Sequence, residues 1–76
     1  MTEYWVSFYS HYDALTFRTE CRSRGIKCSL SSVPRSLSSS CGTAAMVISD
    51  ESPLFFDKAE AVYVKSDGRF EKLEVK

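Results

Sequence analysis

The sequence predicts a small α+β domain in which one main helix packs on a small sheet, and three observations predict it. Several short segments are rich in β-branched and aromatic residues or alternate between apolar and polar residues, as strands do. One longer segment, after the first of these, has apolar residues at helical spacing instead. The chain has 76 residues, which is enough for a single domain with a modest core.

The first strand and the main helix are expected near the N-terminus. Residues 4–9 are aromatic and β-branched and contain no breaker, which favours a strand. Its core face should carry Tyr4, Val6 and Phe8. Ser10 should cap the helix and Gly25 should end it, because serine accepts a hydrogen bond from the first turn and glycine tolerates the left-handed conformation after the last. The buried helical stripe should be Ala14, Phe17 and Cys21.

A second strand is expected over residues 26–30, where apolar and polar residues alternate again. A strand–helix–strand unit with such short connections is most often a right-handed parallel crossover. The carboxyl ends of two parallel strands lie at one edge of a sheet. The start of the helix should therefore lie near the loop that follows the second strand.

The remaining elements follow a long polar loop over residues 31–42. We expect a third strand, a short helix, a fourth strand and a fifth strand over residues 43–48, 54–59, 61–65 and 69–75. Pro53 suits the first turn of the short helix, and Asp67-Gly68 is a strong signal for a two-residue hairpin loop. The order is β-α-β-β-(short α)-β-β, a two-layer sandwich that is ferredoxin-like or related, as one domain over residues 1–76.

Composition argues against several classes of function. Ten Lys and Arg residues balance ten Asp and Glu residues, whereas nucleic-acid-binding domains usually carry a basic excess, so we expect no nucleic-acid partner. No apolar run reaches the roughly 20 residues of a membrane span, and the first residues lack the features of a signal peptide. Three cysteines, an odd number, make a disulfide scaffold a poor interpretation, so we expect a cytoplasmic protein with reduced thiols.

Charge is uneven along the chain even though it sums to zero. Residues 1–42 contain five basic and three acidic side chains, and residues 43–76 contain five basic and seven acidic ones. The basic side chains of the first part are Arg18, Arg22, Arg24, Lys27 and Arg35. This basic stripe is either a docking face for an acidic partner or, more often, an ordinary solvated surface.

The three cysteines occupy different contexts. Cys21 falls on the helical stripe and Cys28 on the apolar face of the second strand, so both are expected to be buried and inert. Cys41 lies in the polar loop, between Ser38-Ser39-Ser40 and Gly42. Hydroxyls and backbone N–H groups there could stabilise a thiolate, and glycine lets the backbone approach a ligand. From the chemistry alone, a reactive thiol and a half-exposed structural cysteine are equally supported.

The predicted topology offers a way to activate such a thiol. The crossover would bring Ser10, His11 and the positive end of the helix dipole close to the loop, and both the dipole and a protonated histidine lower a thiol pKa. A metal site is not expected, because the three cysteines and one histidine include no C-x₂-C pair, and no cofactor motif occurs. A domain this short can hardly enclose a cleft, so an enzyme is the less favoured interpretation.

One run of residues in this loop consists of Val33-Pro34-Arg35, Leu37 and Ser38-Ser39-Ser40-Cys41-Gly42. This run resembles a family of small proteins, the selenium/sulfur carrier-like proteins. Further matching residues are Phe8, Ser10, Asp13, Ala14, Leu15 and Gly25-Ile26. The likeness covers residues 4–48, and after Gly42 the sequence departs from the family's pattern of strand, full helix and strand.

The resemblance implies a carrier protein rather than an enzyme. Cys41 would accept sulfur or selenium as a persulfide or selenosulfide and pass the atom on. The residues expected to hold the anion are Arg35, Ser38, Ser39, Ser40, Gly42 and His11. The implied partners are a donor such as a cysteine desulfurase and an acceptor enzyme, and the choice between sulfur and selenium stays open.

Two other interpretations stay open. The chain could be a non-catalytic interaction module or a subunit of a metabolic enzyme, with the basic stripe as part of its contact surface. The rest of that surface would be four aromatic residues expected to be exposed: Trp5, Tyr9, Tyr12 and Tyr63. The serine-rich loop could instead bind a small anion through its N–H groups. The fifth strand should leave an open edge, through which two copies could pair.

Overall fold

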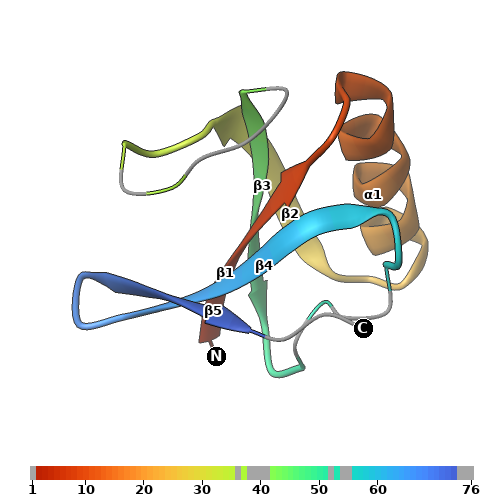
Figure 1. The fold of residues 1–76 in the computed structure, drawn as a ribbon. Coiled ribbons are helices and arrows are strands. Elements are labelled where there is room, and N and C mark those ends of the chain that lie inside the picture. The colour runs from red at the N-terminus through yellow and green to blue at the C-terminus, as the bar shows by residue number, and fades with distance from the viewer. Residues whose placement is uncertain (1, 36, 38–41, 52, 54–55, 74–76) are drawn as a thin grey trace.

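The computed structural model describes residues 2–35, 37, 42–51, 53 and 56–73 (Figure 1). Its elements, in order, are β1 (Thr2–Phe8), α1 (His11–Ser23), β2 (Lys27–Ser32), β3 (Thr43–Ser49), β4 (Ala59–Ser66) and β5 (Arg69–Leu73). The five strands form one sheet, and α1 packs on one of its faces (Figure 1). The predicted α+β class, with a helix on a sheet, is confirmed.

The strand order explains how the first two strands relate. The order is β2-β3-β1-β4-β5, and every neighbouring pair is antiparallel. Because β1 and β2 both run antiparallel to β3, they run parallel to each other, with β3 between them. The predicted parallel relation is confirmed, and the carboxyl ends of β1 and β2 lie at the same edge of the sheet.

Local sequence fixes both ends of α1. The Asp13 backbone N–H donates a hydrogen bond to the Ser10 hydroxyl at 3.2 Å, so Ser10 is the N-cap, as predicted. Beyond the last turn, Gly25 has a φ of 72°, where a residue with a Cβ would be strained. The Ile26 N–H then donates to the Cys21 carbonyl at 2.8 Å, which turns the chain back toward β2.

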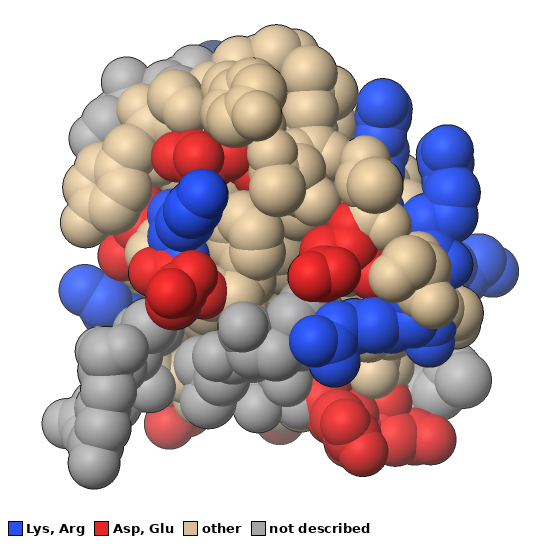
Figure 2. All heavy atoms as spheres, turned by 90° about the vertical axis from the view of Figure 1, so that its right-hand side faces the viewer, with Lys and Arg blue, Asp and Glu red and all other residues tan. Residues whose placement is uncertain are grey.

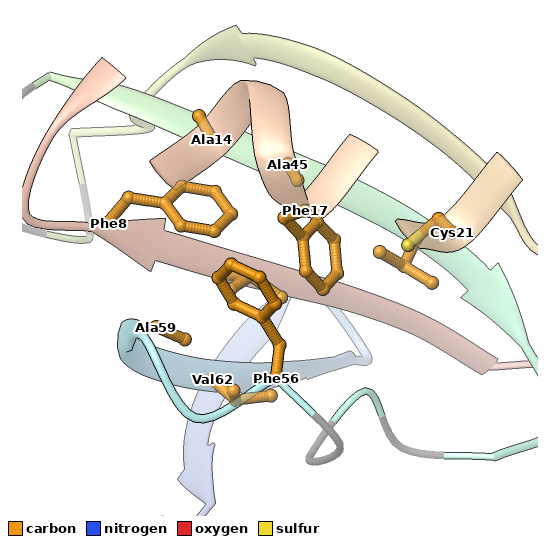
Figure 3. Close-up of a cluster of buried hydrophobic side chains, with 10 residues drawn as sticks. Phe8, Ala14, Phe17, Cys21, Ala45, Phe56, Ala59 and Val62 are labelled. Atoms are coloured by element: carbon orange, nitrogen blue, oxygen red, sulfur yellow. The ribbon is translucent and has the colours of Figure 1, made fainter. Parts of the chain in front are cut away.

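Three phenylalanines from three segments form the centre of the core (Figure 3). The ring centroid of Phe17 lies 5.4 Å from that of Phe8 and 5.1 Å from that of Phe56. The rings of Phe8 and Phe56 are 6.0 Å apart. Such tilted and edge-on contacts are favourable for aromatic rings. The residues predicted to face inward from β1 and α1 all belong to this core or pack against it: Tyr4, Val6, Phe8, Ala14, Phe17 and Cys21.

The short helix expected over residues 54–59 is not found among the described residues of that range. Asp57 and Lys58 form a turn, and Ala59 already begins β4, where it pairs with Phe8. A segment this short gains little from helical hydrogen bonds, whereas burial of Phe56 in the core removes its ring from water. With a single helix in the described part of the chain, the finer ferredoxin-like assignment is not established.

The observed strands extend or shorten the predicted ones by a few residues. β4 extends beyond residues 61–65 in both directions, and β5 is described as far as Leu73, so the expected end at residue 75 lies outside the described chain. Asp67 and Gly68 have positive φ angles of 52° and 76°, as a type I′ hairpin loop requires, so the predicted hairpin is confirmed. In the described ranges, no helix is long and apolar enough to cross a membrane.

Replacing Phe17 with alanine should lower the free energy of unfolding by about 3–5 kcal/mol, the usual cost of removing a phenylalanine side chain from a packed core. Tyr12→Ala is the matched control on the same helix, because the Tyr12 side chain is 74% exposed and surface substitutions change stability by about 0.5 kcal/mol or less. Urea unfolding followed by circular dichroism measures both variants. Equal losses would contradict this account of the core.

Candidate functional site

The candidate site lies at the edge of the sheet where β1 and β2 end and β3 begins (Figure 1). His11 is the first residue of α1, and Thr43 is the first residue of β3, where it pairs with Ser32 at the end of β2. The His11 Nδ1 atom lies 3.4 Å from the Thr43 hydroxyl oxygen, within hydrogen-bonding distance. The start of the helix therefore lies against the base of the loop between β2 and β3, as the parallel crossover predicts.

Backbone hydrogen bonds close the base of this loop. The Val33 N–H donates to the Gly42 carbonyl at 3.2 Å, one step beyond the last residue pair of β2 and β3. The Leu37 N–H donates to the Pro34 carbonyl at 3.0 Å. Gly42 has a φ of 74°, so the chain leaves the loop in a conformation that favours glycine. The loop thus begins and ends at points that the sheet holds in place.

The predicted site residues lie only partly within the described chain. Arg35, Gly42 and His11 are exposed. The other predicted residues lie outside the described residues, so their roles stay predictions: Ser38, Ser39, Ser40 and Cys41. Cys41 is bonded through the peptide chain to Gly42, whose carbonyl oxygen accepts the hydrogen bond from Val33.

The start of α1 supplies a positive electrostatic field at this edge of the sheet. The first backbone N–H groups of a helix lack helical partners, and the helix dipole adds a partial positive charge there. The Ser10 hydroxyl accepts from one of these groups, and the Asp13 carboxylate in the first turn offsets part of the field. A helix terminus at a surface stabilises an anion by about 0.3–1 kcal/mol. A strongly activated thiol at this place would need positive side chains as well.

The structure pairs the two other cysteines with each other, which the sequence analysis did not predict. Cys21 is fully buried, as expected, whereas Cys28 is only half-buried on the edge strand β2. The interaction of the two side chains, together with burial, raises the pKa of Cys21, and the same interaction lowers the pKa of Cys28. The sequence does contain a pattern that could have predicted this interaction. One cysteine lies on the buried stripe of the helix, and the next lies on the inward face of the strand that follows the glycine turn.

The four aromatic residues expected to be exposed divide into two pairs. Tyr9 and Tyr12 are 61% and 74% exposed, on either side of the first residue of α1. Trp5 and Tyr63 are only half-exposed, and the Trp5 ring packs edge-on against Phe70 at 6.0 Å. The prediction is confirmed for the two tyrosines beside the candidate site and holds only in part for the other two residues.

Charged side chains gather in patches on the side of the molecule shown in Figure 2, with basic groups along one margin and acidic groups across the middle and below. The exposed basic residues along the last turns of α1 and the start of β2 are Arg18, Arg22, Arg24 and Lys27. No group of three or more side chains that could ligate a metal occurs within the described part of the chain.

Comparison with models of protein families gives a match over most of the chain. A family model described as "Putative Se/S carrier protein-like" matches residues 3–68. The matched range runs from β1 into the hairpin between β4 and β5. It therefore extends beyond residues 4–48, which carry the resemblance seen in the sequence, and includes the part in which a departure from the family was expected. No curated protein and no solved structure matches the chain.

Gly42→Ala should lower the free energy of unfolding by about 1 kcal/mol, because φ is positive at this residue while a Cβ would meet no atom within 4 Å. Gly68→Ala is the matched control, since Gly68 has nearly the same φ and equally open space in the distant hairpin. Both variants should lose similar stability in urea unfolding. Only Gly42→Ala should change the alkylation rate of Cys41, measured by site-resolved mass spectrometry. An unchanged alkylation rate of Cys41 in Gly42→Ala would contradict the claim that the backbone conformation at Gly42 affects the reactivity of Cys41.

Proposed function

Since the chain belongs to the family of selenium/sulfur carrier-like proteins, we propose that it holds sulfur or selenium on the Cys41 thiol and passes the atom from a donor to an acceptor enzyme. The observation that carries this proposal is the fixed base of the loop beside the start of α1. The hydrogen bond between Val33 and Gly42 closes the base, and the contact between His11 and Thr43 attaches it to the helix. A carrier needs such a frame, because its thiol must be presented to two different partners.

The transfer consists of two sulfur-exchange reactions without net oxidation or reduction. The Cys41 thiolate attacks the terminal sulfur of a persulfide on the donor, for which a cysteine desulfurase is suitable. A bond forms between Cys41 Sγ and that sulfur, the donor's S–S bond breaks, and the donor leaves as a thiolate. A nucleophile of the acceptor then attacks the terminal sulfur, and Cys41 leaves as a thiolate in turn. Selenium would follow the same route as a selenosulfide.

Several groups at the base of the loop favour the negatively charged forms of this cycle. Thiolate and persulfide are both anions, so the start of α1 and a protonated His11 would stabilise them. Arg35, exposed in the turn after β2, adds a positive charge. The serines at positions 38–40 add hydroxyl donors. These contributions are individually modest and act together at the exposed base of the loop, which suits a carrier better than an enzyme with an enclosed cleft.

A non-catalytic interaction module is the second candidate function, and the exposure of Tyr9 and Tyr12 favours it. Large aromatic side chains at a surface are common anchors for partner proteins. A carrier would use the same surface, because a donor must dock beside the thiol. The two functions differ in their dependence on Cys41: a module keeps its complex when the thiol is removed, whereas a carrier loses its cargo.

Replacing Cys41 with serine should abolish loading of the chain with sulfur from a cysteine desulfurase supplied with cysteine. Cys28→Ser is the matched control, because it removes a half-buried thiol and leaves the loop unchanged. Mass spectrometry of the intact chain and its peptides detects the added sulfur and assigns it to a residue. Cys28→Ser should load like the wild type, and the proposal fails if Cys41→Ser does so too.

A further inference from the structure

A pair of cysteine side chains lies toward the other end of α1 from the candidate site. Cys21, in the last turns of α1, is fully buried in the core (Figure 3), and Cys28 of β2 is half-buried and packs against that core. The Ile26 N–H donates to the Cys21 carbonyl at 2.8 Å, which fixes the short connection between the two cysteines. Both side chains therefore lie on the helix-facing side of the sheet, within the same apolar layer.

From this arrangement we propose that Cys21 and Cys28 form a second thiol site, which reacts with low-molecular-weight disulfides and closes to an internal disulfide. A buried thiol and a half-buried thiol lie in the same apolar layer, joined by a short connection. A reaction of this kind requires such an arrangement. One thiol must meet the substrate, and the other must lie within reach of the first. The proposal does not depend on the carrier function.

The pair is distinct from the site at the serine-rich loop. Cys21 is ten residues from His11 along α1, which corresponds to about 15 Å at 1.5 Å per residue. Cys28 lies near the beginning of β2, whereas the loop follows the end of that strand. A substrate at the cysteine pair would therefore approach another part of the surface than a donor docked at the loop.

The two thiols have unequal acidities, and the difference assigns their roles. The interaction with the Cys21 side chain lowers the pKa of Cys28, burial opposes this effect, and the positive charge of Arg18 on α1 supports it. From β3, the residue paired with Cys28 is Val47, which carries no charge. Cys28 is therefore the thiol that ionises first and attacks a substrate.

Cys21 is suited to the second step. Its pKa is raised by the interaction with the Cys28 side chain, by burial and by the negative charges of Cys28 and Glu20, while Arg24 acts in the opposite direction. Once Cys28 is bonded to another sulfur, it no longer carries the negative charge that disfavours ionisation of Cys21. Formation of the mixed disulfide on Cys28 therefore makes it easier for Cys21 to ionise and to attack that disulfide.

Cys28 is half-buried at the edge of the sheet. β2 is an edge strand, so no further strand covers its outer side. An open groove of about 960 Å³ lies along the start of β2 and the end of β3. Its strand side chains Lys27, Ser29, Met46 and Ile48 alternate with the inward-facing Cys28 and Val47, so the groove borders Cys28 across the edge strand. Arg24 and Lys27 bring positive charge to this groove, and Asp50 and Glu51 bring negative charge.

The reaction balances in two exchange steps. The Cys28 thiolate attacks one sulfur of a disulfide RS–SR, a bond forms between Cys28 Sγ and that sulfur, and RS⁻ leaves and takes up a proton. The Cys21 thiol then loses its proton and attacks Cys28 Sγ, and the second RS⁻ leaves. The two cysteines are oxidised by two electrons, and the substrate disulfide is reduced to two thiols.

The test uses folded protein that carries Cys41→Ser, so that its outcome is independent of the proposed carrier function. The protein is incubated with oxidised glutathione, and its peptides are mapped by mass spectrometry without reduction. We expect a peptide linked through Cys21 and Cys28, with two molecules of reduced glutathione released per chain. A lasting glutathione adduct on Cys28, or no product at all, would overturn the proposal.

Two further variants in the same background separate the roles of the two thiols. Cys21→Ala should stop the reaction at a Cys28–glutathione adduct, with one molecule of glutathione released. Cys28→Ser should slow the reaction at least about tenfold, because the remaining thiol is buried. Circular dichroism verifies that each variant is folded. An equally fast reaction at Cys21 in folded Cys28→Ser would contradict the assigned order of attack.

Discussion

The packing of Phe17 against Phe8 and Phe56 is the contact on which the positions of the other elements depend. It fixes the rotation of α1 about its own axis and its position along that axis relative to the sheet. In this position the start of α1 lies against the base of the serine-rich loop, and its last turns place Cys21 near β2. Both thiol sites proposed for this chain therefore follow from the same layer of apolar contacts.

Contacts among the described residues attach the base of the loop that carries Cys41 to this frame. Its base is closed by the hydrogen bond between Val33 and Gly42, and His11 lies against Thr43. The magnitudes show that no single group is enough. A helix terminus contributes about 0.3–1 kcal/mol toward an anion, whereas one pKa unit corresponds to about 1.4 kcal/mol. An activated thiol there requires the helix, His11, Arg35 and the serine hydroxyls to act together.

Much of the fold could be predicted from local patterns in the sequence. Aromatic and β-branched residues predicted β1, and period-two alternation predicted β2. Asp67-Gly68 predicted the hairpin, because its two positive φ angles are a property of these residues. The short second helix was predicted wrongly for the described part of its range, because the burial of Phe56 against Phe8 and Phe17 is a tertiary effect that local propensity does not contain.

The sites could be predicted less completely than the fold. Topology alone placed the start of α1 near the loop, and the contact between His11 and Thr43 joins residues that are 32 positions apart. The pairing of Cys21 with Cys28 was missed, because it depends on how the turn at Gly25 returns the chain beneath the helix. The spacing of apolar residues along a helix identifies a cysteine as inward-facing, but it does not predict which other side chain the cysteine contacts.

The most direct test of the central claim is the rate of Cys41 alkylation as a function of pH, with each labelled cysteine assigned by mass spectrometry. The account predicts that Cys41 ionises well below the ordinary thiol pKa of about 8.5, and that His11→Ala moves this ionisation toward the ordinary value. An ordinary pKa for Cys41 that does not change in His11→Ala would contradict the claim that the frame around the loop activates the thiol.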